Sequence, residues 1–428
     1  MKTYQKVLLG VLVVLLVAFA WYYPKLMRVK EVVSFFDEDR IVENFRTTDE
    51  LVTFNELPAA PRPQSFARDT TRDPLPPAIG IAADKFLDAD AYLQRTYTTG
   101  LLVLQHDTIT YERYFRGHTA AMPQIVWSVS KSFLSTLFGI AVAEGKIRSI
   151  EQTVDEYCPE LKGSGYEGVR IKDVLQMASG VAFNEDYADF WSDINRWGRA
   201  FAWGSSQDDF AAGLVRELEP GTYHHYVSIN THVLGMVLVA ATERSIADYA
   251  VEKLWYPLGM EHDSYWLTDD YGMEMALGGL NTTVRNCAKL GALMVHEGNW
   301  RGRQLVPAAW VQAATTPDAS HLQPGRRENS AHDLGYGYQW WIPQSEDGEY
   351  LAVGVYNQFI YVNPARQTVI VKHSANPNFT TADRLATTDM FLSFCRDVVL
   401  KERLRRGERI LESHLNPTLL REPEPSDD

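Results

Sequence analysis

Cysteine is scarce in this chain of 428 residues, which contains only three. Cys158, Cys287 and Cys395 lie far apart and show no C-x-x-C spacing. The sequence therefore predicts neither a cysteine-ligated zinc site nor a disulfide framework. We expect all three to be buried free thiols, because unpaired cysteine behaves as a small apolar side chain.

An excess of basic residues is also lacking, since the formal net charge is −14. Binding of a phosphate backbone rests on a basic surface, so the charge argues against a nucleic-acid partner. No G-x-S-x-G motif occurs, and a nucleophile elbow is not indicated. The spacing of His224, His225 and His232 suits no common zinc motif, so we interpret them as structural. We expect no metal and no other cofactor.

An apolar run from residue 7 to residue 23 lies between basic residues near the amino terminus. It is close to the ~20 residues that a bilayer span requires. It also resembles a signal peptide, because Ala18-Phe19-Ala20 forms an A-x-A-like cleavage pattern. We favour a retained anchor, since residues 21–23 are aromatic and typical of a membrane interface. The prediction is a single membrane span with an exported body, and the alternative is secretion after cleavage near Ala20.

Strand patterns occur at both ends of the body, at residues 100–115 and 336–373, and helical patterns lie between them. A last amphipathic helix is expected over about 382–402, packed on the sheet. These patterns predict an α/β (α+β) fold, in which one antiparallel sheet is flanked by helices and carries an inserted helical subdomain.

The predicted organisation has four parts. They are an anchor or signal segment at 1–30, an extended proline-rich linker at 31–79, a catalytic domain at 80–405 with a helical insertion at about 150–330, and a polar tail at 406–428.

The motif Ser128-Val129-Ser130-Lys131 precedes a stretch that is apolar on nearly every side and ends at Gly145. That pattern predicts a helix buried all round, with Ser128 in its first turn. Residues three apart share a helix face, so Lys131 is expected beside the Ser128 hydroxyl. Burial lowers the pKa of an amine, and a neutral lysine can take the serine proton. The alternatives are a serine that caps the helix and a lysine that reaches the surface.

The stretches SVSKSF, RIKDVLQMASGVAFNEDY and EPGTYHHYVSINTHVLGMVL resemble serine hydrolases of the β-lactamase fold. The similarity is greatest to the 6-aminohexanoate-oligomer hydrolase and esterase branch, and it covers about residues 78–399. It implies a penicillin-binding-protein-like domain with a catalytic tyrosine in a Y-x-N or Y-x-S motif. Tyr226-Val227-Ser228 matches that motif, and Tyr226 would relay the proton together with Lys131. We expect a nearby ammonium to lower the pKa of this phenol; the alternative is a buried structural aromatic.

In this family a strand bearing K-T-G or H-x-G lines the site, and the matching residues here are Ala352-Val353-Gly354. The cation is absent, but Gly354 permits a close approach of the backbone. The N–H groups of Ser128 and Val355 would form the oxyanion hole. Ser228 replaces the asparagine common in β-lactamases. The resemblance with these departures disfavours β-lactam acids and D-alanyl-D-alanine termini as preferred substrates.

Three aromatic residues are further candidates for substrate contacts. Tyr187 matches a tyrosine that the oligomer-hydrolase branch uses near the nucleophile, and Trp191 and Tyr356 are expected to contact the substrate as well. The alternative for Tyr187 is a loop aromatic packed beside its neighbours.

The sequence thus predicts a serine hydrolase that cleaves a small linear amide or ester through an acyl-enzyme on Ser128. One alternative is a catalytically silent, membrane-tethered binding protein. Others are a D,D-peptidase or a β-lactamase. The expected partners are a small-molecule substrate and the membrane.

Overall fold

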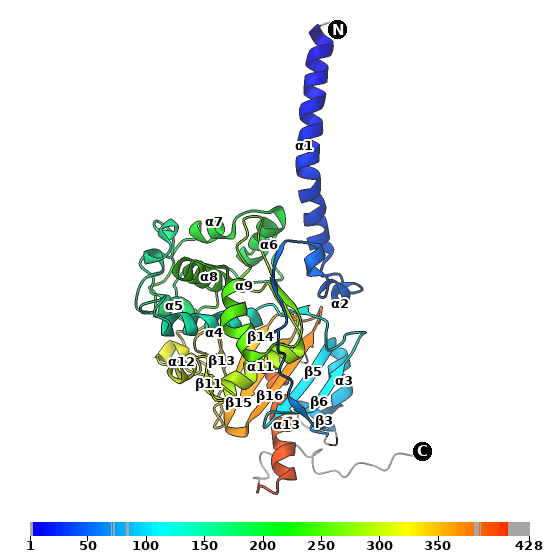
Figure 1. Ribbon diagram of the computed structural model, residues 1–428, viewed down its shortest axis with the longest axis vertical. Helices are drawn as coiled ribbons and strands as arrows, with labels where there is room; N and C mark the ends of the chain where they lie inside the picture. The colour runs from blue at the N-terminus through cyan, green and yellow to red at the C-terminus, as the bar shows by residue number, and fades with distance from the viewer. Residues whose placement is uncertain are drawn as a thin grey trace.

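The computed structural model describes residues 3–69, 71, 73–82, 85–380, 385 and 387–409. An eight-stranded sheet lies at the centre of the body and joins segments far apart in the sequence (Figure 1). All its neighbouring strands are antiparallel except β2 and β6. The spatial order is β12 (Gly335–Tyr336), β13 (Trp341–Ile342), β14 (Tyr350–Gly354), β15 (Gln358–Asn363), β16 (Thr368–Ser374), β5 (Thr98–Gln105), β6 (Thr108–Tyr114) and β2 (Ala67–Arg68).

Alternating side chains bury the two faces of this sheet in separate clusters, as the two-residue period of a strand requires. Leu102 and Leu104 of β5 belong to the main core, which also includes residues of α4 (Val129–Ala143) and α11 (Val284–Val295). Leu101 and Val103 belong to a second cluster. That cluster includes residues of α3 (Ala89–Arg95) and α13 (Thr388–Arg405). The predicted packing of the last helix on the sheet is confirmed for the described residues.

A second, four-stranded antiparallel sheet was not expected from the sequence. Its order is β1 (Phe54–Leu57), β8 (Ser264–Leu267), β9 (Leu280–Thr282) and β7 (Gln124–Ile125). The remaining strands form two hairpins, β3 (Ala78–Ala82) with β4 (Lys85–Asp88) and β10 (Asn299–Trp300) with β11 (Arg303–Gln304).

The predicted insertion at 150–330 is not all helical. Strands β8 to β11 and α11 lie within this range, and α11 packs on the main sheet rather than with the inserted helices. The helices from α5 to α8 lie together at one end of the body (Figure 1). The helices of the range other than α11 are α5 (Ile171–Leu175), α6 (Asp193–Trp203), α7 (Gln207–Ala212), α8 (Ser228–Thr242), α9 (Ile246–Ala250), α10 (Tyr256–Leu258) and α12 (Ala308–Ala314).

Helix α1 (Thr3–Ser34) extends from the body as a single long helix (Figure 1). Among the described residues, it alone is long and apolar enough to cross a membrane, and its most apolar window is 0% buried. A membrane span and a signal sequence both agree with this finding.

The proposed linker at 31–79 differs from the structure. Helix α1 continues to Ser34, a short helix α2 (Ile41–Asn44) follows, and β1 pairs with β8. The segment is therefore partly built into the body, because its apolar residues Phe35, Ile41 and Phe45 are buried in the main core. The three cysteines are free and buried, as predicted. The proposed tail lies outside the described residues from 410 onward.

Candidate functional site

Ser128 lies at the junction between β7 and α4. The residue before it, Trp127, has a φ of +48°, a conformation that bulky side chains rarely adopt. Ser128 occupies the N-cap position of α4, but its side chain makes no capping hydrogen bond. The hydroxyl is therefore not used as a helix cap, and it lines two adjacent pockets.

Lys131 is one helical turn further along α4 and is 1% exposed. Its Nζ donates hydrogen bonds to the Ser128 Oγ, at 3.0 Å, and to the Leu277 carbonyl oxygen. Burial lowers the pKa of Lys131 to about 7, although the charge of Glu185 acts in the opposite direction. The side chain does not reach the surface. An amine with this pKa is partly neutral at neutral pH and can accept a proton from the serine.

Tyr226 precedes α8, and its ring stacks on Trp341 with the centroids 5.2 Å apart. The Lys131 Nζ lies 5.4 Å from the centroid of the tyrosine ring. Burial, followed by the charge of Glu185, raises the pKa of Tyr226, while hydrogen bonding to the Ser128 and Ser228 hydroxyls acts in the opposite direction. The expected lowering of this pKa is wrong, because desolvation outweighs these hydrogen bonds. The phenol keeps its proton and can donate it.

Glu185 is a residue of the site that the sequence analysis missed. Its carboxylate accepts hydrogen bonds from the Ser228 N–H at 3.0 Å, from the Ser228 hydroxyl, and from the Tyr187 hydroxyl at 2.9 Å. Burial raises its pKa, against the opposing effect of Lys131. Glu185 accepts a hydrogen bond from the first residue of α8. The positive end of the helix dipole lies there and favours a negative charge on this carboxylate. Its place in the sequence, two residues before Tyr187, was the available signal.

Strand β14 lines the second pocket together with Ser128, through Val353 and Gly354. A Cβ on Gly354 would lie 2.6 Å from the Val126 carbonyl oxygen, so only glycine allows β14 to approach the segment that carries Ser128. Val355 follows directly and lines both pockets. This placement is compatible with an oxyanion hole made by the N–H groups of Ser128 and Val355, which stays a prediction.

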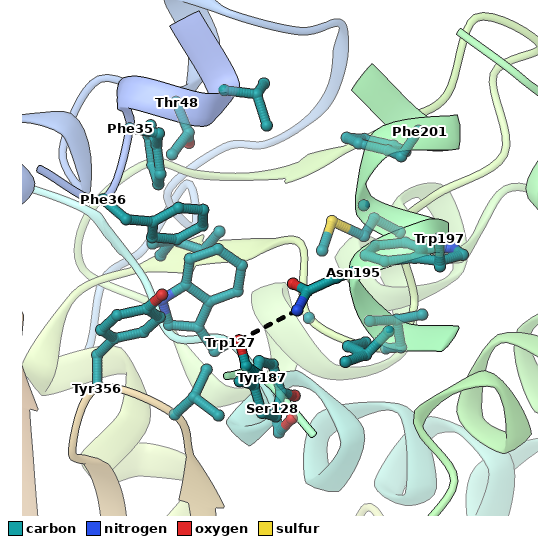
Figure 2. Close-up of a pocket in the computed structure, with 18 of the residues that line it drawn as sticks. Phe35, Phe36, Thr48, Trp127, Ser128, Tyr187, Asn195, Trp197, Phe201 and Tyr356 are labelled. Atoms are coloured by element: carbon teal, nitrogen blue, oxygen red, sulfur yellow. Dashed lines mark hydrogen bonds between the residues drawn. The ribbon is translucent and has the colours of Figure 1, made fainter. Parts of the chain in front are cut away.

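Two pockets meet at Ser128. The first has a volume of about 360 Å³, and Figure 2 shows Phe35 and Phe36 on one side of it and Trp197 and Phe201 on the other. None of its lining residues in the described chain carries a charge. The second has a volume of about 480 Å³ and is more polar. Its polar and ionisable lining residues are Ser128, Glu185, Asp186, Tyr187, His225, Tyr226, His332, Tyr356, Asn357 and Thr388.

The sequence profile of the Beta-lactamase family matches residues 84–392. The chain belongs to the β-lactamase family.

Among curated relatives of this β-lactamase-family chain, the 6-aminohexanoate-dimer hydrolase of Paenarthrobacter ureafaciens is 30% identical over 320 residues. The match covers 72% of this chain and 81% of the relative. A protein of Salmonella agona named for D-alanyl-D-alanine carboxypeptidase is 23% identical over 215 residues, covering 44% and 49% of the two chains. The solved structure of a Bacillus anthracis protein named for 6-aminohexanoate-dimer hydrolase has a TM-score of 0.77 at 21% identity, covering 88% and 97%. These matches support a hydrolase with the β-lactamase fold.

The structure brings Tyr187 and Tyr356 to the site of this β-lactamase-family protein, since both line both pockets. Tyr356 has a φ of +62° in the tight turn after β14, and its ring stacks on Phe36 at 5.4 Å. Ser228 lines neither pocket, and its hydroxyl donates a hydrogen bond to the Glu185 carboxylate. It is a positioning residue for that carboxylate.

Trp191 is not brought to the site. Its side chain is 78% exposed, it packs edge-on against Phe190, and it belongs to neither pocket wall. Other aromatic residues line the first pocket instead, among them Trp127, Phe35 and Phe36. Sequence patterns did not indicate the last two, because the linker that carries them was expected to lie apart from the site.

Proposed function

We propose that the protein is a serine hydrolase that cleaves a linear amide or ester through an acyl-enzyme on Ser128. The observation that carries the proposal is the hydrogen bond between the Lys131 Nζ and the Ser128 Oγ, made by an amine whose pKa is lowered to about 7. A buried amine with a lowered pKa that donates to a serine hydroxyl lining a pocket is suited to act as the base that activates this serine.

In this mechanism Lys131 takes the proton from Ser128 while the Oγ attacks the substrate carbonyl. The amino end of α4 and the N–H groups of Ser128 and Val355 stabilise the oxyanion. Tyr226 donates its proton to the departing amine or alcohol, and the proton held on Lys131 restores the phenol. Water then attacks the acyl-enzyme. The same proton transfers run in reverse, from water through Tyr226 and Lys131 to the Ser128 Oγ, and the acid and the free serine are released.

The charges that line the second pocket indicate which kind of leaving group it can bind. It has no lysine or arginine among its described lining residues, and it contains the carboxyl groups of Glu185 and Asp186. Ala352 stands where a basic residue would bind a substrate carboxylate. A neutral or amine-bearing leaving group therefore suits this pocket better than an acid does. The relative named for hydrolysis of the 6-aminohexanoate dimer supports cleavage of a linear amide.

Substrate comparison on one preparation tests the proposal. We expect p-nitrophenyl acetate to be hydrolysed with kcat/KM at least about tenfold above nitrocefin and a D-alanyl-D-alanine peptide, because no cation pairs with the carboxylates of the last two substrates. A fluorophosphonate probe should label the protein. Nitrocefin turnover well above ester turnover would overturn the substrate ranking, and absence of both labelling and hydrolysis would favour a silent binding protein.

The pH dependence of hydrolysis is a second test. Lys131 accepts a proton only when neutral, and its pKa is lowered to about 7, so kcat/KM should rise as the pH increases through about 7. No decrease from Tyr226 is expected at moderately alkaline pH, since burial raises the pKa of that phenol. The profile is measured with p-nitrophenyl acetate at constant ionic strength. A kcat/KM that falls across neutral pH would exclude Lys131 as the base.

We also propose that α1 is retained as a membrane anchor with the body exported. Its interfacial end contacts the body, since Tyr22 stacks on Trp203 with the centroids 6.1 Å apart. Arg28 pairs with Asp270 at 2.7 Å and donates to the Ala202 carbonyl oxygen.

A further inference from the structure

The first pocket is built partly by the helix that carries the apolar terminal run. Val32 in the last turn of α1, and Phe35 and Phe36 just after it, line the pocket together with Ser128. Phe35 is 12 residues beyond Tyr23, the end of the apolar run. At a rise of 1.5 Å per residue, this wall lies about 18 Å along the helix axis from the end of the run.

Helix α6 supplies the opposite wall. Ile194, Gly198 and Phe201 lie on one side of this helix and line the pocket. The carboxyl end of α6 contacts α1 through Trp203 and the Ala202 carbonyl oxygen. Figure 2 shows the two walls facing each other across the pocket, with Ser128 and Tyr187 at its base. The pocket therefore lies between the juxtamembrane end of α1 and a helix attached to it.

The two pockets at Ser128 differ in chemistry. The one walled by α1 and α6 has no charged lining residue among the described part of the chain, whereas the other contains two carboxyl groups and two histidines. A substrate whose carbonyl is at Ser128 would place one end in each. Most of the lining side chains of the first pocket are aromatic or aliphatic, with Thr48, Asn195 and Thr380 as polar exceptions beside Ser128. Burial of an apolar chain against such a lining is favourable. The polar pocket suits a hydrated head group.

We propose that the substrate is an amphiphile of the bilayer, with a long apolar acyl chain that enters the pocket between α1 and α6 and a polar amine or alcohol as leaving group. The proposal rests on the serine-hydrolase function above and specifies its substrate class. The Ser128 Oγ forms the ester bond with the acyl carbon, and the bond to the leaving nitrogen or oxygen breaks as that atom takes a proton. Water then releases the fatty acid.

Acyl-chain preference in a matched pair of variants tests the pocket. A Cβ on Gly198 would meet nothing within 4 Å, so Gly198→Leu projects a side chain into the pocket without a backbone clash. The change also removes a glycine from a helix interior, which favours folding. Ala200→Leu adds the same residue to the same helix at a position outside the pocket walls. The measurement is the ratio of kcat/KM for p-nitrophenyl octanoate to that for the acetate, with full-length protein in detergent.

We expect this ratio to be about ten or more in the wild type and in Ala200→Leu, and to fall about tenfold in Gly198→Leu. A wild-type ratio below one, or an equal ratio in the two variants, would overturn the acyl-chain pocket while leaving the serine-hydrolase function intact. Absence of hydrolysis of both esters and of fluorophosphonate labelling would instead contradict the underlying function.

A second experiment distinguishes a substrate taken up from the bilayer from a substrate taken up from water. Full-length protein is reconstituted in phosphatidylcholine vesicles that also contain p-nitrophenyl palmitate, or is mixed with separate vesicles that contain the ester. The tethered pocket sees a high local concentration only in the shared bilayer, so hydrolysis there should be faster by about tenfold or more. Equal rates would overturn uptake from the bilayer.

Discussion

Replacing Ser128 by alanine is expected to lower kcat for p-nitrophenyl acetate by roughly 10⁴-fold or more and to abolish labelling by a fluorophosphonate. The Oγ is the atom to which the acyl group is transferred, and no other group can accept it in the same geometry. The loss should be in kcat rather than in KM, because alanine leaves the pocket walls unchanged. Steady-state kinetics and gel-based labelling on one preparation measure both effects.

The structure gives a reason to expect that this variant folds. The Ser128 side chain makes no capping hydrogen bond to α4, so its removal does not weaken the helix start. Ser345→Ala, in an exposed loop away from the site, is the matched control and should keep full labelling. Equal labelling of Ser128→Ala and the wild type would show that another residue is the nucleophile.

Replacing Lys131 by methionine is expected to reduce kcat by about 10³-fold, within the range that a positioned general base contributes. Methionine is similar in length and apolar, so it fills the same space beside Ser128 but cannot take its proton. The rise in kcat/KM near pH 7 should disappear as well, since that rise belongs to the amine of Lys131. The full pH profile of the variant is the measurement that separates loss of the base from a general disturbance.

The free energy of unfolding of Lys131→Met is the control, because it shows whether the variant still folds. Lys131 is 1% exposed, and a buried amine carries a desolvation cost that methionine removes. The substitution also leaves the Leu277 carbonyl oxygen without its lysine donor, which costs about 1–3 kcal/mol. These effects oppose each other, so the free energy of unfolding should change by no more than about 2 kcal/mol. A variant that stays folded and retains full activity and an unchanged pH profile would exclude Lys131 as the base.

The hydrogen-bonded pair of Ser128 and Lys131 could be predicted from the sequence because its geometry is local. Ser128 and Lys131 are three residues apart on a helix that is apolar all round, and such spacing places the two side chains together in any α-helix. Tyr226 is 95 residues further along the chain by numbering, so its place beside Lys131 came only from the family resemblance. Glu185 was missed because it interacts with residues far along the chain that no periodicity relates to it. It accepts a hydrogen bond from Ser228, and its charge acts on the pKa of Lys131.

The amino-acid sequence by itself indicated the neighbouring side chains of Ser128 and Lys131, the central sheet, the terminal apolar helix and the absence of a cation at Ala352. These features depend on residue identity and on spacings within one helix or strand. Tertiary structure alone decided the raised pKa of Tyr226, the exposure of Trp191 and the use of Phe35 and Phe36 as pocket walls. Burial and long-range packing cause all three, and neither can be read from the order of residues along one segment.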